Sequence, residues 1–182
     1  MTRILVAGIG NIFRGDDAFG VEVAQRLARR PLPDAVKVVD FGIRGIDLTY
    51  ALLDGYDAAI LIDAAQRGAP PGTVSIIAPE QPSPEPNPPD ILFIEPHDLD
   101  PAKILNLVAA LGGGCRRILL VACEPATFGD EEMGAMGLSP VVADAVDWGV
   151  VAVEQLVGEL LQASIRSNPN GNQSSELGGE IR

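Results

Sequence analysis

Two aspartates and the only histidine of the chain are the residues whose types suit catalysis or metal binding. Asp17 follows the first apolar run, Asp63 ends the third, and His97 stands in the segment Glu95-Pro96-His97-Asp98. Two carboxylates and one imidazole can hold a borderline divalent metal and leave positions open for water or a substrate. The alternative is that Asp63 caps the following segment and that His97 lies on the surface.

A glycine-rich turn precedes Asp17. Gly8-Ile9-Gly10 lies between an apolar run and a helical pattern, where dinucleotide-binding proteins hold a pyrophosphate. Asp40, which ends the second apolar run, could bind a ribose. Phe13 replaces the third glycine of that fingerprint, so we expect the close helix–strand approach to be missing. The alternative function is therefore a nucleotide-binding module or oxidoreductase that uses Gly8, Gly10 and Asp40.

Two adjacent carboxylates weaken that alternative. Asp16 and Asp17 stand where a Walker-type phosphate loop has its lysine and its Ser or Thr. Carboxylates repel a phosphate, but they stabilise the N-terminus of a helix, so capping is the simple interpretation of both. We expect Asp16 to support the loop rather than bind metal, because adjacent side chains at a strand-to-helix turn diverge.

The sequence offers no obvious nucleophile. Any Ser-His-Asp or Cys-His arrangement would have to use His97, and neither a Gly-x-Ser-x-Gly nor a His-Glu-x-x-His motif is present. Ser139 precedes Pro140, a pair typical of a helix start. Attack by water is therefore favoured over an acyl-enzyme.

The elements that must position these residues follow an alternating pattern. Short apolar runs typical of buried parallel strands alternate with helical periods, which predicts an α/β three-layer sandwich with a mostly parallel sheet of about five strands and helices on both faces. The expected strands are 3–9, 35–41, 57–63 and 116–123, with an edge strand at 72–78. The expected helices are 17–30, 46–53, 101–111 and 139–161.

Two stretches fall outside this pattern and set the domain limits. Residues 79–90 contain six prolines in twelve positions, which predicts an exposed loop insertion. Residues 164–182 are rich in Ser, Asn and Gly, which predicts a disordered tail. The chain is therefore expected to be one domain over residues 1–163.

Composition excludes several classes of protein. The formal net charge is -12, which opposes binding to nucleic acid or to an anionic membrane surface. No apolar run approaches the roughly 20 residues that span a bilayer. Cys115 and Cys123 form no disulfide framework or metal knuckle, so both are expected in the core. The first apolar run is too short for a signal peptide, and we expect a cytoplasmic protein.

Five stretches together resemble the hydrogenase maturation endopeptidases, which process the large subunit of nickel-iron hydrogenases. They span residues 3 to about 160 and occur in the family's order. The stretches are Gly8-Ile9-Gly10-Asn11 with Asp16-Asp17-Ala18-Phe19-Gly20, Asp40-Phe41-Gly42-Ile43-Arg44-Gly45, Leu61-Ile62-Asp63-Ala64, Pro96-His97-Asp98-Leu99 and Gly137-Leu138-Ser139-Pro140.

The resemblance implies a function. Such proteins are aspartic-type endopeptidases, hydrolases that remove a C-terminal extension from the large-subunit precursor after nickel insertion. By motif position, Asp17, Asp63 and His97 would be both the catalytic residues and the ligands of the nickel already in the precursor. No permanently bound cofactor is then needed. The expected partner is that precursor, with no nucleic acid or membrane, and the protein is expected to be a monomer.

Two departures from the family pattern concern substrate choice. Phe41-Gly42-Ile43 replaces a Gly-Gly-Thr-like segment that resembles a substrate-contacting turn. The 79–90 loop is longer than usual and precedes His97. It is either a tolerated insertion or a docking element for a particular large subunit.

Overall fold

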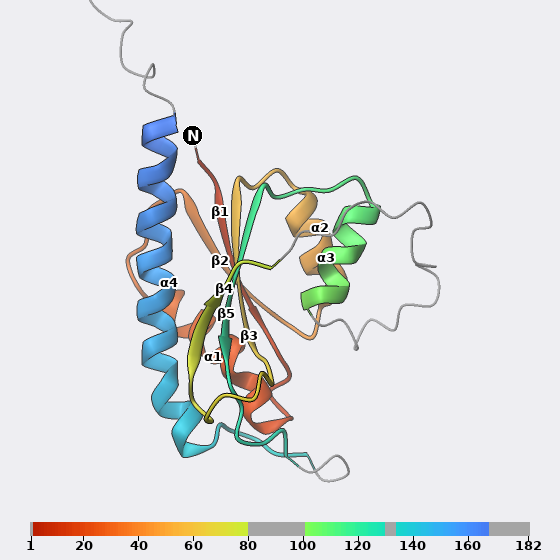
Figure 1. The fold of residues 1–182 in the computed structure, drawn as a ribbon, viewed down its shortest axis with the longest axis vertical. Helices are drawn as coiled ribbons and strands as arrows, with labels where there is room; N and C mark the ends of the chain where they lie inside the picture. Colours follow the sequence, from red (N-terminus) through yellow and green to blue (C-terminus); the bar gives the residue numbers. More distant parts are fainter. Residues whose placement is uncertain (1, 80–100, 130–133, 168–182) are drawn as a thin grey trace, which may run out of the picture.

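The apolar runs form one five-stranded sheet in the part of the chain that the structure describes, which is residues 2–79, 101–129 and 134–167 of a computed structural model. The strand order is β2-β1-β3-β5-β4. The first four of these are parallel, and the edge strand β4 is antiparallel to β5 (Figure 1). The strands are β1 (Ile4–Ile9), β2 (Val36–Gly42), β3 (Ala58–Ala64), β4 (Val74–Ile77) and β5 (Arg117–Cys123).

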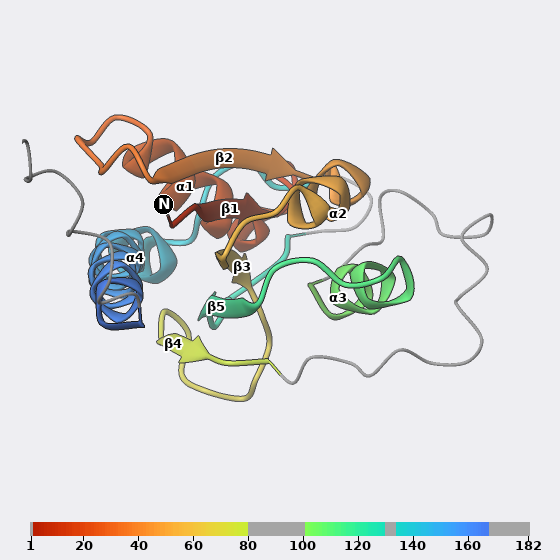
Figure 2. The same ribbon diagram turned by 90° about the horizontal axis from the view of Figure 1, so that it is seen from above.

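Helices cover both faces of the sheet, as Figure 2 shows. One face packs against α1 (Phe19–Leu27) and α4 (Pro140–Ser167), and the other against α2 (Gly45–Leu53) and α3 (Pro101–Ala110). Successive residues of a strand point to opposite faces. Accordingly, Ile4 and Val6 of β1 join the core under α1 and α4, whereas Leu5 and Ala7 join the core under α2 and α3. The predicted three-layer α/β sandwich is confirmed.

Glycines bring α1 against the strand ends. A Cβ atom at Gly8 would lie 2.4 Å from the carbonyl oxygen of Gly20, and one at Gly20 would lie 2.3 Å from the carbonyl oxygen of Ile9. Such contacts are possible only without a side chain. The expectation that replacement by Phe13 abolishes the close helix–strand approach is therefore wrong, because Gly20, inside the helix, provides it.

The helix boundaries differ most from the expected ones at α1, which ends at Leu27 instead of residue 30, and at α4. The helix expected from Asp17 begins instead as a 3-10 turn, η1 (Gly15–Ala18), which leads into α1. Helix α4 continues to Ser167, past the expected start of the tail at 164, and the Ser164 hydroxyl donates to the carbonyl oxygen of Leu160. Gly149 and Gly158 lie inside α4 without ending it, and no proline follows Pro140 within the helix. Residues 168–182 lie outside the described residues, as do residues 80–90 of the predicted insertion.

Within the described segments, no helix combines the length and the apolar character needed to cross a membrane.

Candidate functional site at the carboxyl edge of the sheet

The predicted site residues lie where parallel strands end. Asp17 belongs to η1, the first element after β1, and Asp63 is the penultimate residue of β3. The backbone of Gly20 lies against both strand ends, since a Cβ atom there would be 2.1 Å from the carbonyl oxygen of Ile62. Ligands of open α/β sheets bind at this edge. The fold therefore places both aspartates on neighbouring segments at the edge where chemistry is expected.

Asp17 is half-buried, and its carboxylate faces the turn after β1. Its Oδ2 accepts a hydrogen bond from the Asn11 backbone N–H at 2.9 Å. Burial raises the pKa of the Asp17 carboxyl above its ordinary value of 3.8, and the Asn11 hydrogen bond and the charge of Arg14 offset only part of that rise. A half-buried carboxyl with a raised pKa suits a group that exchanges a proton at a functional site.

Asp63 is nearly buried, with 8% of its surface exposed. It lies two residues after Leu61, whose side chain joins the core under α2 and α3, so Asp63 points to that same face. Its register partner on β5 is Ala122. Because the alanine side chain is small, other segments can approach the aspartate on this side. The aspartate thus borders the layer that contains α3.

His97 lies outside the described residues. Among the residues that the structure does describe, no three His, Cys, Asp or Glu side chains come together in a way that could hold a metal ion. The predicted trio of Asp17, Asp63 and His97 therefore stays a prediction.

Asp16 has the structural role that the sequence suggests. Its side chain is fully buried, and its Oδ2 accepts hydrogen bonds from the backbone N–H groups of Ala126 and Thr127 at 2.8 and 3.0 Å. Ser139 adds two more, from its backbone N–H at 2.6 Å and its hydroxyl at 2.9 Å. Asp16 thus joins the η1 turn to the segments after β5 and before α4, and its oxygens are already occupied.

The glycine turn also uses its own backbone donors, which argues against a bound pyrophosphate. The N–H of Gly10 donates to the carbonyl oxygen of Gly42 at 3.0 Å, and that of Asn11 donates to Asp17. Gly10 has φ of 134°, and a Cβ atom there would overlap the Asp17 carbonyl oxygen. The carboxylate of Asp40 accepts from Gln25 at 3.1 Å. The structure gives the nucleotide alternative no support.

Comparison with known proteins agrees with this geometry. A family model described as HycI, hydrogenase maturation protease, matches residues 21–157. The chain belongs to the hydrogenase maturation protease family. The hydrogenase 2 maturation protease of Escherichia coli strain K12 is 31% identical over 172 residues, which cover 92% of this chain and 96% of the relative. HupD of Bradyrhizobium diazoefficiens, a hydrogenase expression/formation protein, is 28% identical, and the match covers 98% of this chain and 91% of HupD.

Solved structures of two endopeptidases have the same fold. An endopeptidase from Escherichia coli, solved in solution, superimposes with a TM-score of 0.65 at 30% identity and covers 92% of this chain and 94% of its own. The maturating endopeptidase HybD of Escherichia coli gives 0.62 at 25% identity with the same coverage. This family member is therefore a protease, a hydrolase built on the predicted sandwich.

Neither cysteine of this protease is a candidate nucleophile. Cys115 and Cys123 are both buried, as predicted. Burial raises the pKa of the Cys115 thiol, and burial with the nearby charges of Asp16 and Glu124 raises the pKa of Cys123 to about 11. Thiols with raised pKa values stay protonated at neutral pH and react slowly.

Glu124 is a residue of this edge that the sequence reasoning missed. It follows β5 directly and is buried. Its carboxylate accepts from the backbone N–H groups of Arg67, Gly68 and Ala69 at 2.8, 3.2 and 3.2 Å. Glu124 therefore fixes the segment that follows Asp63. The signal in the sequence is a carboxylate placed between a buried strand and Pro125.

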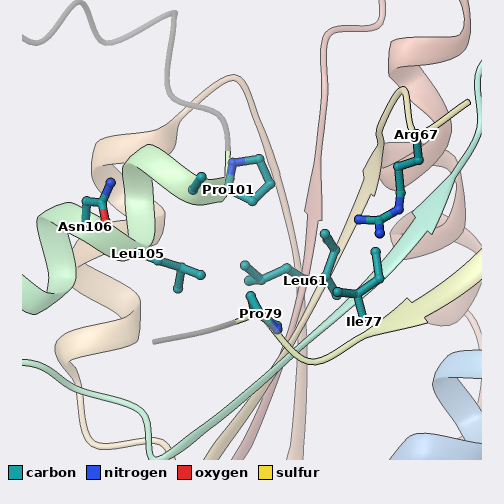
Figure 3. A pocket seen from close by; sticks show the side chains of 9 residues that line it. Leu61, Arg67, Ile77, Pro79, Pro101, Leu105 and Asn106 are labelled. Atoms are coloured by element: carbon teal, nitrogen blue, oxygen red, sulfur yellow. The ribbon is translucent and has the colours of Figure 1, made fainter. Parts of the chain in front are cut away.

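A pocket of about 310 Å³ opens between α3 and the sheet of this protease (Figure 3). Its walls come from β3, β4, β5 and α3, together with the segments at 67 and 79. The lining residues are Leu61, Arg67, Ile77, Pro79, Pro101, Ala102, Leu105, Asn106 and Leu120. The sequence did not indicate this pocket, because its walls come from segments far apart in the chain.

Proposed function

We propose that the protein removes the C-terminal extension of a nickel-iron hydrogenase large-subunit precursor after nickel insertion, and that it recognises the inserted nickel through Asp17, Asp63 and His97. The main support is the placement of Asp17 and Asp63 on neighbouring segments at the carboxyl edge of the sheet. Membership of the hydrogenase maturation protease family supports the reaction class. The family match includes the positions of Asp63 and His97.

The proposed chemistry uses the substrate's own nickel. Two carboxylates and an imidazole are suitable ligands for a borderline divalent ion. A cation held beside the cleaved bond polarises its carbonyl oxygen and orients it for attack. One of the aspartates then activates a water molecule, consistent with buried, protonated thiols at Cys115 and Cys123. The enzyme needs no permanently bound metal in this scheme, and cleavage depends on prior nickel insertion.

The turn after β2 is a second proposed contact with the precursor. Gly42 has φ of 55° and its carbonyl oxygen accepts from Gly10, so this turn is fixed beside the turn that leads to Asp17. Ile43 is exposed next to it. We expect Phe41-Gly42-Ile43 to influence which precursor is accepted.

Incubation with a nickel-loaded large-subunit precursor tests the proposal, with the intact mass of the precursor as the measurement. Loss of a C-terminal peptide from the loaded precursor alone, and no loss with the His97→Ala variant, is the expected result. Cleavage of nickel-free precursor at the same rate would contradict recognition through nickel. No cleavage of any large subunit from the same organism would overturn the proposed function.

A further inference from the structure

The pocket beside α3 lies on the same face of β3 as the proposed catalytic aspartate. Leu61 forms part of its wall, and Asp63 follows on the same strand and the same sheet face. Two residues of a strand span about 6.6 Å, which is close to the repeat of an extended peptide. A peptide with its cleaved bond at Asp63 would therefore place a neighbouring side chain at the mouth of this pocket.

The lining of the pocket indicates what it binds. Most of the lining side chains are apolar, and Leu61, Ile77 and Leu105 converge on the space in Figure 3. A volume of about 310 Å³ is at the lower end of the roughly 300–1,000 Å³ range of small-molecule sites. The pocket thus has room for one or two apolar side chains and little more.

Arg67 contributes the one cationic group of the lining. It comes from the segment after β3, and Figure 3 places it above Ile77, across the pocket from α3. The Arg67 backbone N–H donates to the Glu124 carboxylate at 2.8 Å, so the backbone of Arg67 is held in place. Within the described residues the structure gives Arg67 no ion pair. Its guanidinium can therefore donate hydrogen bonds to a ligand.

We propose that this pocket is the specificity pocket of the protease: it takes an apolar side chain next to the cleaved bond, while Arg67 donates to a carbonyl oxygen of the same peptide. This inference rests on the proposed function, because the peptide is the segment that the enzyme cleaves. The pocket then selects the residue at the cleavage point, and Asp63 lies beside the bond.

A variant that fills the pocket tests this inference. Ala102 lies on the rim and is exposed, so Ala102→Leu adds volume without burying a new group elsewhere. Ala110→Leu, at the other end of α3 and outside the lining, is the matched control. The substrates are nickel-loaded precursors in which each residue flanking the cleaved bond is changed in turn to Ala, Leu or Asp, and kcat/KM is measured for each.

The expected result is a change of preference. At one flanking position the wild type should prefer Leu to Asp by at least about tenfold, since apolar pockets discriminate on this scale. Ala102→Leu should lower kcat/KM about tenfold more for substrates with Leu at that position than for substrates with Ala. Ala110→Leu should lower kcat/KM equally for both. Equal loss for all substrates, or no preference in the wild type, would overturn the proposal.

Arg67→Gln tests the polar contact, with Arg29→Gln in the exposed turn after α1 as the control. The expected effect is a higher KM with kcat nearly unchanged, because Arg67 binds the peptide without touching the cleaved bond. A loss confined to kcat, or no change in either constant, would contradict the role given to Arg67.

If the wild type does not cleave the precursor, the proposed function is wrong. The proposed pocket is then tested by peptide binding alone. Peptides that carry Leu or Asp at the centre are then titrated into methyl-labelled protein. Selective shifts of the Leu61, Leu105 and Ile77 methyl signals with the Leu peptide would support an apolar pocket. Shifts elsewhere only, or none, would overturn it.

Discussion

At the residue scale, two adjacent aspartates have separate tasks because their surroundings differ. Asp16 is buried and meets four donors, whereas Asp17 is half-buried, accepts from Asn11 and has a raised pKa. The four donors of Asp16 come from residues more than 100 positions away in the chain. The first aspartate therefore maintains the architecture of the edge, and the second is the one that we propose for chemistry.

Replacement of each aspartate by asparagine should separate these tasks. Asp16→Asn places an amide N–H₂ against backbone donors, and we expect it to lower the free energy of unfolding by about 3 kcal/mol. Asp17→Asn keeps an acceptor for Asn11 and should not lower stability, but it should abolish cleavage. Urea unfolding and precursor cleavage of folded protein are the measurements. Equal loss of cleavage in the two folded variants would contradict the assignment.

The raised pKa of Asp17 should also affect stability. A raised acid pKa means that the folded state holds the proton more tightly than the unfolded chain. The stabilisation that this proton gives to the folded state is complete below pH 3.8 and is lost as the pH rises through the folded pKa. Asp17→Asn removes this loss. Relative to wild type, the variant should therefore become more stable between pH 3.8 and neutrality.

Urea unfolding at a series of pH values measures that difference. Asp144→Asn, an exposed position on α4, is the control for removing a carboxylate. A stability difference between wild type and Asp17→Asn that does not vary with pH would show that burial does not perturb this carboxyl.

At the scale of elements, the close contact of η1 and α1 with the strand ends positions Asp17 near β3. Gly20 is the residue on which that contact depends, since its Cβ would lie 2.1 Å from one carbonyl oxygen and 2.3 Å from another. Backbone atoms cannot move as a flexible side chain can. Any side chain at this position must therefore displace the helix.

Gly20→Ala should lower the free energy of unfolding by about 3 kcal/mol, because overpacking of this kind forces a backbone shift. Gly158→Ala on α4 is the matched control, since nothing lies within 4 Å of its added Cβ atom. That control should raise stability by about 0.5–1 kcal/mol, the difference in helix propensity. Thermal unfolding measures both, and a tolerated Gly20→Ala would show that the helix can move away without cost.

Much of this architecture could be predicted from the sequence, because strands and helices have local patterns. Apolar runs gave β1, β2, β3 and β5 within a residue or two, and the rule for parallel sheets placed Asp17 and Asp63 at one edge. Contacts between distant segments have no such pattern. The partners of Asp16, the role of Glu124, the fit of Gly20 and the pocket walls all depend on the folded chain.

At the scale of the whole molecule, charge and architecture favour the same class of substrate. The chain carries a net charge of -12, and carboxylates gather where the parallel strands end: Asp16, Asp17, Asp63 and Glu124. Such an edge attracts cations and repels phosphate groups. A protein substrate that carries a metal ion is compatible with this field, whereas a dinucleotide is not.

Titration with NADH, followed by its fluorescence, tests this distinction at the level of function class. We expect no saturable binding up to millimolar concentrations, because the turn after β1 directs its N–H groups to Gly42 and Asp17 instead of to a ligand. An established dinucleotide-binding dehydrogenase serves as the positive control. Saturable NADH binding that is lost in Gly10→Ala would support the nucleotide alternative. It would mean that the turn after β1 rearranges to accept a pyrophosphate. Absence of NADH binding would favour the proposed carboxylate chemistry of Asp17 and Asp63 at this edge.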